Sequence, residues 1–310
     1  MKYSEKKGLK LSAFQLGTVQ LGMDYGITGK TDKPSESYAY EILNTAIKNG
    51  VNTLDTANNY GDSERVIGKW LSSIDTTSRP VIITKIGPFD HSSEAALRED
   101  IRRQAQMSLV TLGVDTVDVM MLHNFEDYLA DPEVVIEEFK KIKEEGKARL
   151  IATSAYSEHD YRAIAVSGFE AVQIPLNVFD HTRINDGGIG ALAEAGVAIF
   201  ARSVFLQGLV FMNPDTLQPK MRFAEDALRK YLAIAEKFDM SPDVLAVSFA
   251  LSIPGVTSVV LGCQTPEQVV ANAEMTDKTR VLTRDEMDEI RNAFEDIERA
   301  VVDPRLWPKA

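Results

Sequence analysis

The sequence has 310 residues and a net charge of -12, because 34 lysines and arginines stand against 46 aspartates and glutamates. Hydrophobic residues make up 44% and charged residues 26%, the balance of an ordinary folded protein with a sizeable core. The length fits two domains or one α/β barrel. The acidic balance argues against a nucleic-acid surface, although a local basic pocket stays open, and it favours small molecules as partners.

Signals for membranes, disulfides and metals are absent from the sequence. No apolar run reaches membrane-spanning length and the first residues lack a signal-peptide core, so we expect a cytoplasmic protein with no membrane partner. Cys263 is the only cysteine, which excludes an internal disulfide and a cysteine-based zinc cluster. The histidines show no tight metal-binding spacing, so no metal is expected. The sequence carries no signal for an oligomeric state.

Short apolar segments alternate with helical patterns along the whole chain. The strongest strand pattern lies at 80–85, where four consecutive β-branched residues are bounded by Pro80 and Gly87. Counted from Ala13, the pattern predicts eight strands, each followed by a helix. They lie within residues 9–16, 53–55, 80–85, 117–122, 150–154, 171–175, 197–201 and 258–261.

Capping signals mark the starts of several helices. Thr283 and Glu286 predict a capping box for a last helix whose hydrophobic face reaches Ile297. In three other places a capping side chain precedes a first-turn proline. These predicted caps are Asp131, Ser241 and Thr265.

Eight strand–helix units follow one another without a linker between them. This pattern favours a single (β/α)8 TIM barrel domain over residues 1–310, rather than a doubly wound sheet with a second domain. A long loop at 205–222 is expected after the seventh strand, and the last helix is an extra C-terminal one.

Residues at the carboxyl ends of barrel strands meet at one face, where barrel enzymes hold their active sites. Tyr60 stands in a loop five residues after the end of the second strand. Seven of the predicted strands bring a polar residue or a glycine to that face. In chain order these are Asp55, Lys85, His123, Ser154, Gln173, Arg202 and Gly262. The sequence therefore predicts a polar site there.

Six separated motifs, in order over nearly the whole chain, resemble the aldo-keto reductase family. They are LDTANNYGDSERVIG, VIITK, MLHN, GKARLIATS, QIPLN and PGVTSVVLG. The resemblance implies a reductase that converts an aldehyde or ketone to an alcohol with NAD(P)H. It also implies that Asp55, Tyr60, Lys85 and His123 form the catalytic tetrad.

The chemistry of carbonyl reduction suits these four residue types. Hydride delivery leaves a negative oxygen that must be protonated, and a free tyrosine, with a pKa near ~10, is a weak acid. Lys85 is expected to lower the pKa of Tyr60, and Asp55 to hold the lysine. His123 would hydrogen-bond the carbonyl oxygen. The structural alternatives are an Asp55–Lys85 salt bridge that only closes the barrel, a loop anchor at Tyr60 and a core histidine.

The resemblance also implies a cofactor extended across the barrel mouth, with NADP(H) favoured and NAD(H) possible. Ser154 is followed by Ala155 where the family usually has asparagine, which leaves one contact to the nicotinamide carboxamide in doubt. The implied cofactor residues are Gly17 and Thr18 beneath the ring, Ser154 and Gln173 at the carboxamide, Arg202, Ser203, Leu206 and Gly208 in the pyrophosphate loop, and Gly262, Gln264, Gln268 and Asn272 toward the adenosine.

Two further departures from the family pattern concern charge. Arg202 stands where an aromatic residue usually stacks on the nicotinamide, so it either stacks there as a planar guanidinium or reaches an anionic substrate. Gln264 and Gln268 stand where members that prefer NADPH usually present a basic residue to the 2'-phosphate. Gln268 also fits a capping box with Thr265.

Substrate contacts are expected from the variable loops and the tail. The candidates are Gln20, Tyr25, Asn124 and Trp307. Their polarity, together with Arg202, favours a hydroxylated or acidic aldehyde such as a sugar derivative, and the family subgroup with an RSVFLQG loop resembles proteins of sugar metabolism. Two other functions stay open: a non-catalytic barrel that senses nicotinamide nucleotides, and a lyase or isomerase that depends on Lys85.

Overall fold

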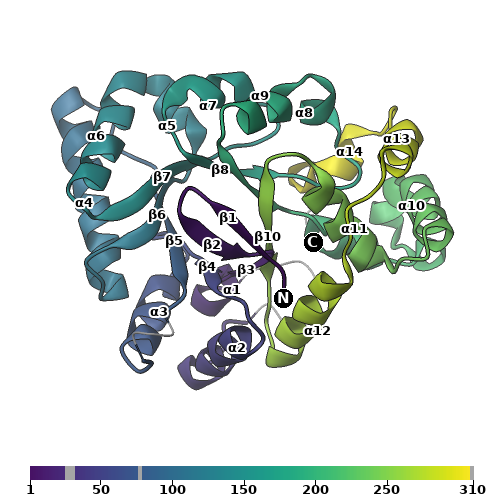
Figure 1. Cartoon of the computed structure of the whole chain (residues 1–310), viewed down its shortest axis with the longest axis horizontal. Coiled ribbons are helices and arrows are strands. Elements are labelled where there is room, and N and C mark those ends of the chain that lie inside the picture. Colours follow the sequence, from purple (N-terminus) through teal and green to yellow (C-terminus); the bar gives the residue numbers. More distant parts are fainter. Residues whose placement is uncertain (25–31, 76–78, 308–310) are drawn as a thin grey trace.

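The computed structural model describes residues 1–24, 32–75 and 79–307. Eight parallel strands close into a barrel in the order β10-β3-β4-β5-β6-β7-β8-β9, with helices around it (Figure 1). This confirms the predicted (β/α)8 barrel. The barrel strands are β3 (Phe14–Gly17), β4 (Thr53–Asp55), β5 (Val81–Ile86), β6 (Val117–Leu122), β7 (Ala148–Ser154), β8 (Ala171–Pro175), β9 (Ala198–Arg202) and β10 (Val256–Gly262).

A β-hairpin precedes the barrel and covers one end of it (Figure 1). Its strands, β1 (Tyr3–Lys6) and β2 (Leu9–Ser12), pair antiparallel, and Lys7 and Gly8 turn the chain with positive φ angles of 52° and 75°. Leu9 and Leu11 pack into the interior of the barrel. The segment expected to be extended over 9–16 therefore forms two strands separated at Ala13, and the second of them, β3, is the first strand of the barrel, as the count from Ala13 predicts.

The four helices whose caps were predicted begin directly after those residues. Ser35 accepts a hydrogen bond from the backbone N–H of Tyr38 at 3.3 Å, and Thr283 with Glu286 forms the predicted capping box. The helices are α1 (Val19–Gly22), α2 (Glu36–Lys48), α3 (Ser63–Leu71), α4 (Glu94–Leu112), α5 (Phe125–Ala130), α6 (Pro132–Glu144), α7 (Tyr161–Ser167), α8 (Thr182–Asn185), α9 (Gly188–Glu194), α10 (Glu225–Lys237), α11 (Pro242–Ser252), α12 (Pro266–Lys278), α13 (Arg284–Ala293) and α14 (Arg299–Val302).

Two predicted caps make no capping hydrogen bond through their side chains. Asp131 and Ser241 occupy the positions before Pro132 and Pro242, yet neither side chain bonds the first turn of its helix. The carboxylate of Asp131 instead pairs with His91, whose Nδ1 lies 2.6 Å from Asp131 Oδ2. A tertiary partner thus replaces the local one.

The last predicted helix and the predicted loop also differ in detail. α13 ends at Ala293, so Phe294 follows it and packs edge-on against Phe179, with ring centroids 5.0 Å apart, and Ile297 lies beyond the helix. The stretch 205–222 is not wholly irregular. It contains the 3-10 segments η2 (Leu206–Phe211), η3 (Pro214–Thr216) and the start of η4 (Pro219–Ala224), and a further one, η5 (Pro304–Leu306), lies in the tail.

The alternation of side chains along each barrel strand positions the polar site. On β5, Val81 and Ile83 face the barrel interior, and Lys85 is the next residue on the same face. On β9, Ala198 and Phe200 face inward and Arg202 continues that row. The carboxyl ends of these rows thus meet above an apolar barrel core.

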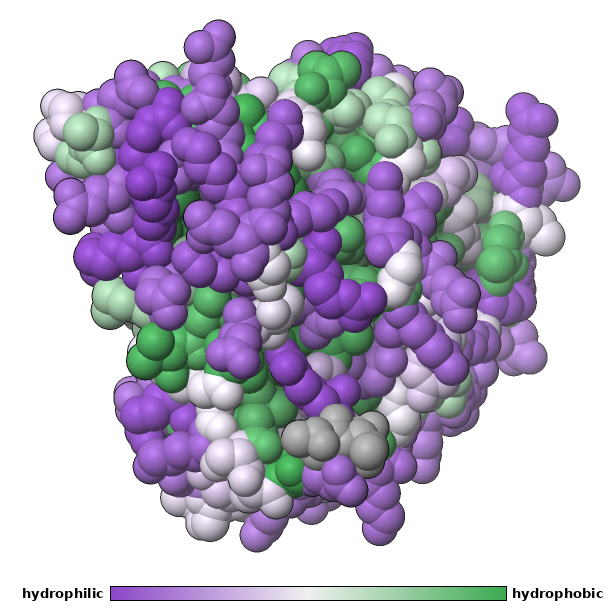
Figure 2. Space-filling view, turned by 60° about the vertical axis from the view of Figure 1, so that its left-hand side comes forward, coloured by the Kyte–Doolittle hydropathy of each residue, from purple (hydrophilic) through white to green (hydrophobic). Residues whose placement is uncertain are grey.

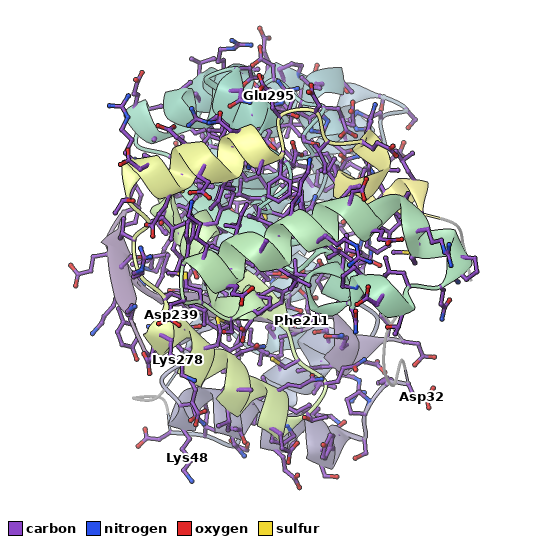
Figure 3. The ribbon with its side chains drawn as sticks, turned by 90° about the vertical axis from the view of Figure 1, so that its right-hand side faces the viewer. Asp32, Lys48, Phe211, Asp239, Lys278 and Glu295 are labelled. Carbon is purple, nitrogen blue, oxygen red and sulfur yellow. The ribbon has the colours of Figure 1, made fainter. Side chains whose placement is uncertain are left out.

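The outer surface over α4 and α6 is strongly charged. Figure 2 shows a predominantly hydrophilic face on the side that carries these helices. Arg98 and Arg102 both bind Glu138, whose side chain is fully buried. Elsewhere around the barrel, α2 and α12 pack together, with Lys48 and Lys278 marking their last residues (Figure 3). Within the described residues, no helix is long and apolar enough to span a membrane.

Candidate active site

A cleft of about 720 Å³ opens at the carboxyl ends of the barrel strands. Of the residues singled out from the sequence, Lys85, Leu206, Asn124 and Trp307 do not line it, and Tyr25 lies outside the described residues. The others do: Gly17, Thr18, Gln20, Asp55, Tyr60, His123, Ser154, Gln173, Arg202, Ser203, Gly208, Gly262, Gln264, Gln268 and Asn272.

A buried ion pair forms the floor of the cleft. Lys85 Nζ donates to Asp55 Oδ1 at 2.6 Å and to the Thr56 carbonyl oxygen at 3.1 Å, and its side chain is 1% exposed. The other carboxylate oxygen, Asp55 Oδ2, accepts from Gln173 Nε2 at 2.7 Å. Both oxygens of Asp55 are thus occupied. Gln173 therefore uses its amide N–H to hold the ion pair.

Tyr60 lies beside this ion pair and half-buried in the wall of the cleft. Its ring centroid is 5.0 Å from Lys85 Nζ and 5.6 Å from the His123 ring, which meets it edge-on at 79°. Loss of surrounding water raises the pKa of the Tyr60 phenol, and Lys85 acts in the opposite direction without outweighing it. Lys85 therefore acts in the expected direction, but the net pKa of Tyr60 is raised rather than lowered. The phenol keeps its proton at neutral pH.

Two glycines fix the loop that carries Tyr60. A side chain at Gly22, in α1, would overlap the backbone oxygen of Tyr60, and one at Gly61 would overlap the backbone oxygen of Gly22. Gly61 also has a positive φ of 56°. Asp62 N donates to Gly22 O at 3.0 Å. Close backbone packing against α1 thus sets the position of the phenol.

His123 directly follows β6, and its ring is a neighbour of the Tyr60 ring in the cleft. Loss of water, followed by the charges of Lys85 and Arg202, lowers its pKa to about 3. The imidazole is therefore neutral at physiological pH and carries one N–H. Its Nδ1 is buried and has no hydrogen-bond partner among the described residues.

Arg202 reaches the cleft from the end of β9. Its guanidinium makes two long hydrogen bonds, from Nη2 to the Ala155 carbonyl oxygen at 3.3 Å and from Nη1 to Ser203 Oγ at 3.4 Å. Its Cζ lies 4.5 Å from the ring centroid of Tyr156, and Arg305 Cζ from the tail lies 4.5 Å from the same ring. Tyr156 was missed in the sequence, although it follows Ala155 where the family pattern is broken.

The connection after β9 holds an unusual concentration of left-handed backbone. Ser203, Leu206 and Gln207 have φ angles of 60°, 44° and 53°, and Gly208 follows at 95°. Such conformations cost of order 1–3 kcal/mol each for non-glycine residues and tend to gather at binding sites. Leu206 is fully buried and anchors the turn in the core, so its side chain is not available to the cleft.

Two aromatic residues at the rim of the cleft were not foreseen from the sequence. Phe205 and Phe211 line it, with ring centroids 5.0 Å apart at 62°. Phe211 is 56% exposed and lies on the side of the molecule that carries α10 to α13 (Figure 3). Only their place in the connection after β9 could have indicated them, because sequence patterns do not separate a rim aromatic from a core one.

The far end of the cleft, at the start of α12, is polar and uncharged. Gln268 Oε1 accepts from the backbone N–H of Gln264 at 2.7 Å, and Gln268 N donates to Thr265 Oγ1 at 3.2 Å. Asn272 Nδ2 lies 3.3 Å from Cys263 Sγ. Of the described residues that line the cleft, Arg202 alone is cationic. The predicted capping box is half formed, because the Gln268 side chain bonds Gln264 rather than Thr265.

Two candidate substrate residues lie away from the cleft. Trp307 is 8% exposed, its Nε1 donates to the Ala300 carbonyl oxygen at 2.7 Å, and its ring packs toward Phe223. Asn124 caps α5 by accepting from the backbone N–H of Glu126. Both side chains are used within the fold, whereas Gln20 lines the cleft and has a buried Oε1 without a partner among the described residues.

The donor set fits an uncharged or anionic organic ligand. Within the described ranges, no group of three histidine, cysteine or acidic side chains is placed to hold a metal ion. The cleft volume falls in the range of small-molecule and cofactor sites. Its strained turn, its glycines and the unpartnered Gln20 Oε1 are consistent with a nucleotide cofactor that approaches the backbone closely.

Comparison with known proteins identifies the family. The model for the "Aldo/keto reductase family" matches residues 13–295. A Schizosaccharomyces pombe protein named "Putative voltage-gated potassium channel subunit beta" is 28% identical over 93% of this chain and 92% of its own length. L-galactose dehydrogenase of Arabidopsis thaliana is 25% identical over 90% and 88%.

The fold is shared with solved structures of the same family. The holo form of an aldo-keto reductase from Bacillus halodurans superimposes with a TM-score of 0.74 and 22% identity, and the match covers 98% of this chain and all of that one. This likeness concerns the fold, while the family match spans nearly every strand and helix described above. The chain therefore belongs to the aldo/keto reductase family of oxidoreductases.

Proposed function

We propose that the protein reduces an aldehyde or ketone to the corresponding alcohol with a nicotinamide cofactor, and that Tyr60 is the proton donor. The observation that carries this proposal is the placement of Tyr60 at the cleft wall, close to both the His123 ring and the buried Lys85–Asp55 pair. An acid, a neutral hydrogen-bond donor and a buried cation thus surround one point of the cleft, where a carbonyl oxygen would gain its proton.

Each of the four residues has a distinct role in this proposal. The cofactor, when bound, supplies the hydride. The Tyr60 hydroxyl gives its proton to the carbonyl oxygen, and the Lys85 ammonium stabilises the tyrosinate that remains. Asp55 holds that ammonium through the 2.6 Å contact. Neutral His123 donates a hydrogen bond to the same carbonyl oxygen and orients the substrate.

The cofactor would lie along the cleft, from the barrel centre to the start of α12. Gly17, Thr18 and Ser154 would contact its nicotinamide end, and the turn at 203–208 its pyrophosphate. We propose NADP(H) as the cofactor, with NAD(H) as the alternative. Because Gln264, Gln268 and Asn272 are uncharged, a 2'-phosphate would be held without a cation, and we expect weak discrimination between the two.

The proposal is tested by following NADPH and NADH oxidation with a panel of aldehydes and ketones. Turnover is expected for the wild-type protein and a fall in kcat of roughly 10²- to 10⁴-fold for Tyr60→Phe. Tyr3→Phe is the matched control, because it removes a hydroxyl that binds Gly50 far from the cleft. Full activity of Tyr60→Phe would rule out the proposed proton donor.

A second candidate is a barrel that binds the nucleotide and signals its redox state without turnover. It is favoured by similarity to the Schizosaccharomyces pombe protein named as a channel subunit. Under this alternative, NADPH binds and quenches the protein fluorescence, yet no carbonyl compound is reduced. The same panel therefore separates the two functions.

A lyase or isomerase that depends on Lys85 is less well supported. A Schiff base requires a neutral amine. Burial alone would lower the pKa of Lys85, but Asp55 and Tyr60 outweigh burial and raise it, so the side chain is an ammonium at neutral pH. Aldehyde that borohydride trapped covalently on Lys85 would reverse this judgement.

A further inference from the structure

The Arg202 guanidinium is the least satisfied charge in the cleft. Among the described residues no carboxylate forms an ion pair with it, and its two hydrogen bonds to Ala155 and Ser203 are both 3.3 Å or longer. A guanidinium has five donors and is commonly paired with two parallel bonds to a carboxylate. Most of the donors of Arg202 therefore remain available to a ligand.

The charges of the described residues in and beneath the cleft sum to one positive unit at neutral pH. Lys85 and Asp55 cancel as an ion pair. Tyr60 and His123 are neutral, because the pKa of the phenol is raised and the pKa of the imidazole is lowered to about 3. Arg202 is left as an unbalanced cation in a protein whose net charge is -12. Arg202 is therefore the side chain in the described cleft whose charge an anionic ligand group would meet.

The orientation of Arg202 is held from behind by the C-terminal tail. Tyr156 lies against the Arg202 guanidinium, and Arg305 lies against the same ring. Arg305 is itself held by Glu158 and Asp303, at 2.8 Å from each. Stacking on an aromatic face leaves the edge of a guanidinium, where its N–H groups are, free to bind.

We propose that the natural substrate carries a carboxylate next to or near its carbonyl group, and that Arg202 binds this carboxylate across the cleft from Tyr60. This inference rests on the proposed reductase function and names its substrate class: an aldehyde acid, a keto acid or an oxidised sugar acid. Arg202 sets specificity by forming two charge-assisted hydrogen bonds, and Tyr156 and Arg305 act as positioning residues.

A competing role for Arg202 is contact with the cofactor itself. If the guanidinium stacked on the nicotinamide or bound the pyrophosphate, its removal would weaken cofactor binding and affect every substrate alike. A carboxylate receptor has a different signature, because its removal affects only the acidic member of a matched substrate pair. The ratio of two kcat/KM values separates these roles.

The experiment compares 4-carboxybenzaldehyde with 4-formylbenzamide, which has nearly the same shape and no charge. In the wild type, the acid is expected to be reduced with the higher kcat/KM. Arg202→Gln should lower the ratio of acid to amide by roughly 10- to 100-fold, because a hydrogen bond to a charged group is lost. Arg202→Lys should keep part of the preference, since the charge remains without the planar fork.

Arg222→Gln is the matched control. Arg222 is exposed in η4 of the same connection and does not line the cleft, so this variant removes one positive charge without changing the ratio. Dissociation constants for NADPH and NADH are measured by fluorescence quenching for every variant. A second pair, glyceraldehyde 3-phosphate and glyceraldehyde, reports on phosphate in place of carboxylate.

Three outcomes would overturn the carboxylate assignment. They are an unchanged acid-to-amide ratio in Arg202→Gln, an equal loss on both members of the pair with weaker cofactor binding, and a loss confined to the phosphorylated pair. Turnover of the neutral amide by the wild type keeps the reductase proposal standing in each case. If no aldehyde is reduced at all, the reductase proposal itself fails.

Discussion

Replacing Asp55 with asparagine removes the charge that compensates Lys85 and keeps the shape of the side chain. In the wild type, Oδ1 accepts from Lys85 and Oδ2 from Gln173, at 2.6 and 2.7 Å. The side-chain amide of asparagine has only one acceptor oxygen for these two donors. Its NH2 group is itself a donor and would face either Lys85 or Gln173. Breaking a buried ion pair in this way costs about 3–5 kcal/mol of unfolding free energy. We expect that loss for Asp55→Asn in urea unfolding at pH 7.

The same change has a pH-dependent signature. In the wild type, Asp55 and Tyr60 outweigh burial and raise the pKa of Lys85, so the stability it contributes is present below the unfolded pKa of about 10.4 and is lost only at more alkaline pH. Without Asp55, burial dominates and lowers the pKa of Lys85. Below the pKa of the unfolded lysine, the folded variant must then give up a proton that the unfolded chain keeps, and this lowers its free energy of unfolding. The difference in stability between the variant and the wild type should therefore narrow as the pH rises toward 10.

A double variant distinguishes lost charge compensation from simple disruption. Asp55→Asn combined with Lys85→Met removes both charges and should recover about half or more of the lost stability, since no uncompensated ammonium remains in the barrel. Its carbonyl reduction should stay low, because no cation remains beside Tyr60. If the double variant were less stable than Asp55→Asn, or if Asp55→Asn matched the wild type at pH 7, this reasoning would be wrong.

Three further predictions use other parts of the site. Loss of water lowers the pKa of His123 to about 3, so the imidazole takes up a proton near pH 6.5 in the unfolded chain but not in the folded protein. The free energy of unfolding should therefore fall by roughly 1 to 2 kcal/mol between pH 7 and pH 5. In urea titrations, His123→Gln should lose less stability over that range. Gln268→Arg should raise the preference for NADPH over NADH by roughly tenfold in kcat/KM, because it adds a cation in the first turn of α12. Gly22→Ala should abolish turnover by displacing the Tyr60 loop, whereas Gly190→Ala, which has open space around its Cβ, should leave activity and melting temperature within error.

The sequence allowed the barrel and the strand-end residues to be predicted, because one rule governs both. Side chains alternate along a strand, and parallel strands end at one face, so Asp55, Lys85 and His123 had to meet if the strands were placed correctly. The eight barrel strands lie within a few residues of the predicted ranges. Family resemblance supplied Tyr60, which no periodicity would have selected.

The contacts of individual side chains could not be predicted, because they depend on which groups the folded chain brings within reach. Asp131 reads as a local cap, yet His91 takes its carboxylate. Trp307 reads as a tail residue that could contact the substrate, yet its indole is buried and donates to the Ala300 carbonyl oxygen. Tyr156 carries no motif, and only the folded chain brings it between Arg202 and Arg305.

The balance of effects on Tyr60 also clarifies what Lys85 contributes to the proposed reaction. If the ammonium lowered the pKa of the phenol below neutral pH, the phenol would already be ionised in the free protein and would have no proton to give. Loss of water keeps the proton in place instead, since it outweighs the nearby charge. The ammonium then acts mainly after transfer, when the tyrosinate forms 5.0 Å from it or closer in a site with little water to screen the pair. Under the proposal, burial keeps the Tyr60 hydroxyl protonated before the reaction, and Lys85 stabilises the tyrosinate after proton transfer. Tyr60 therefore depends on both the apolar barrel floor and the ion pair.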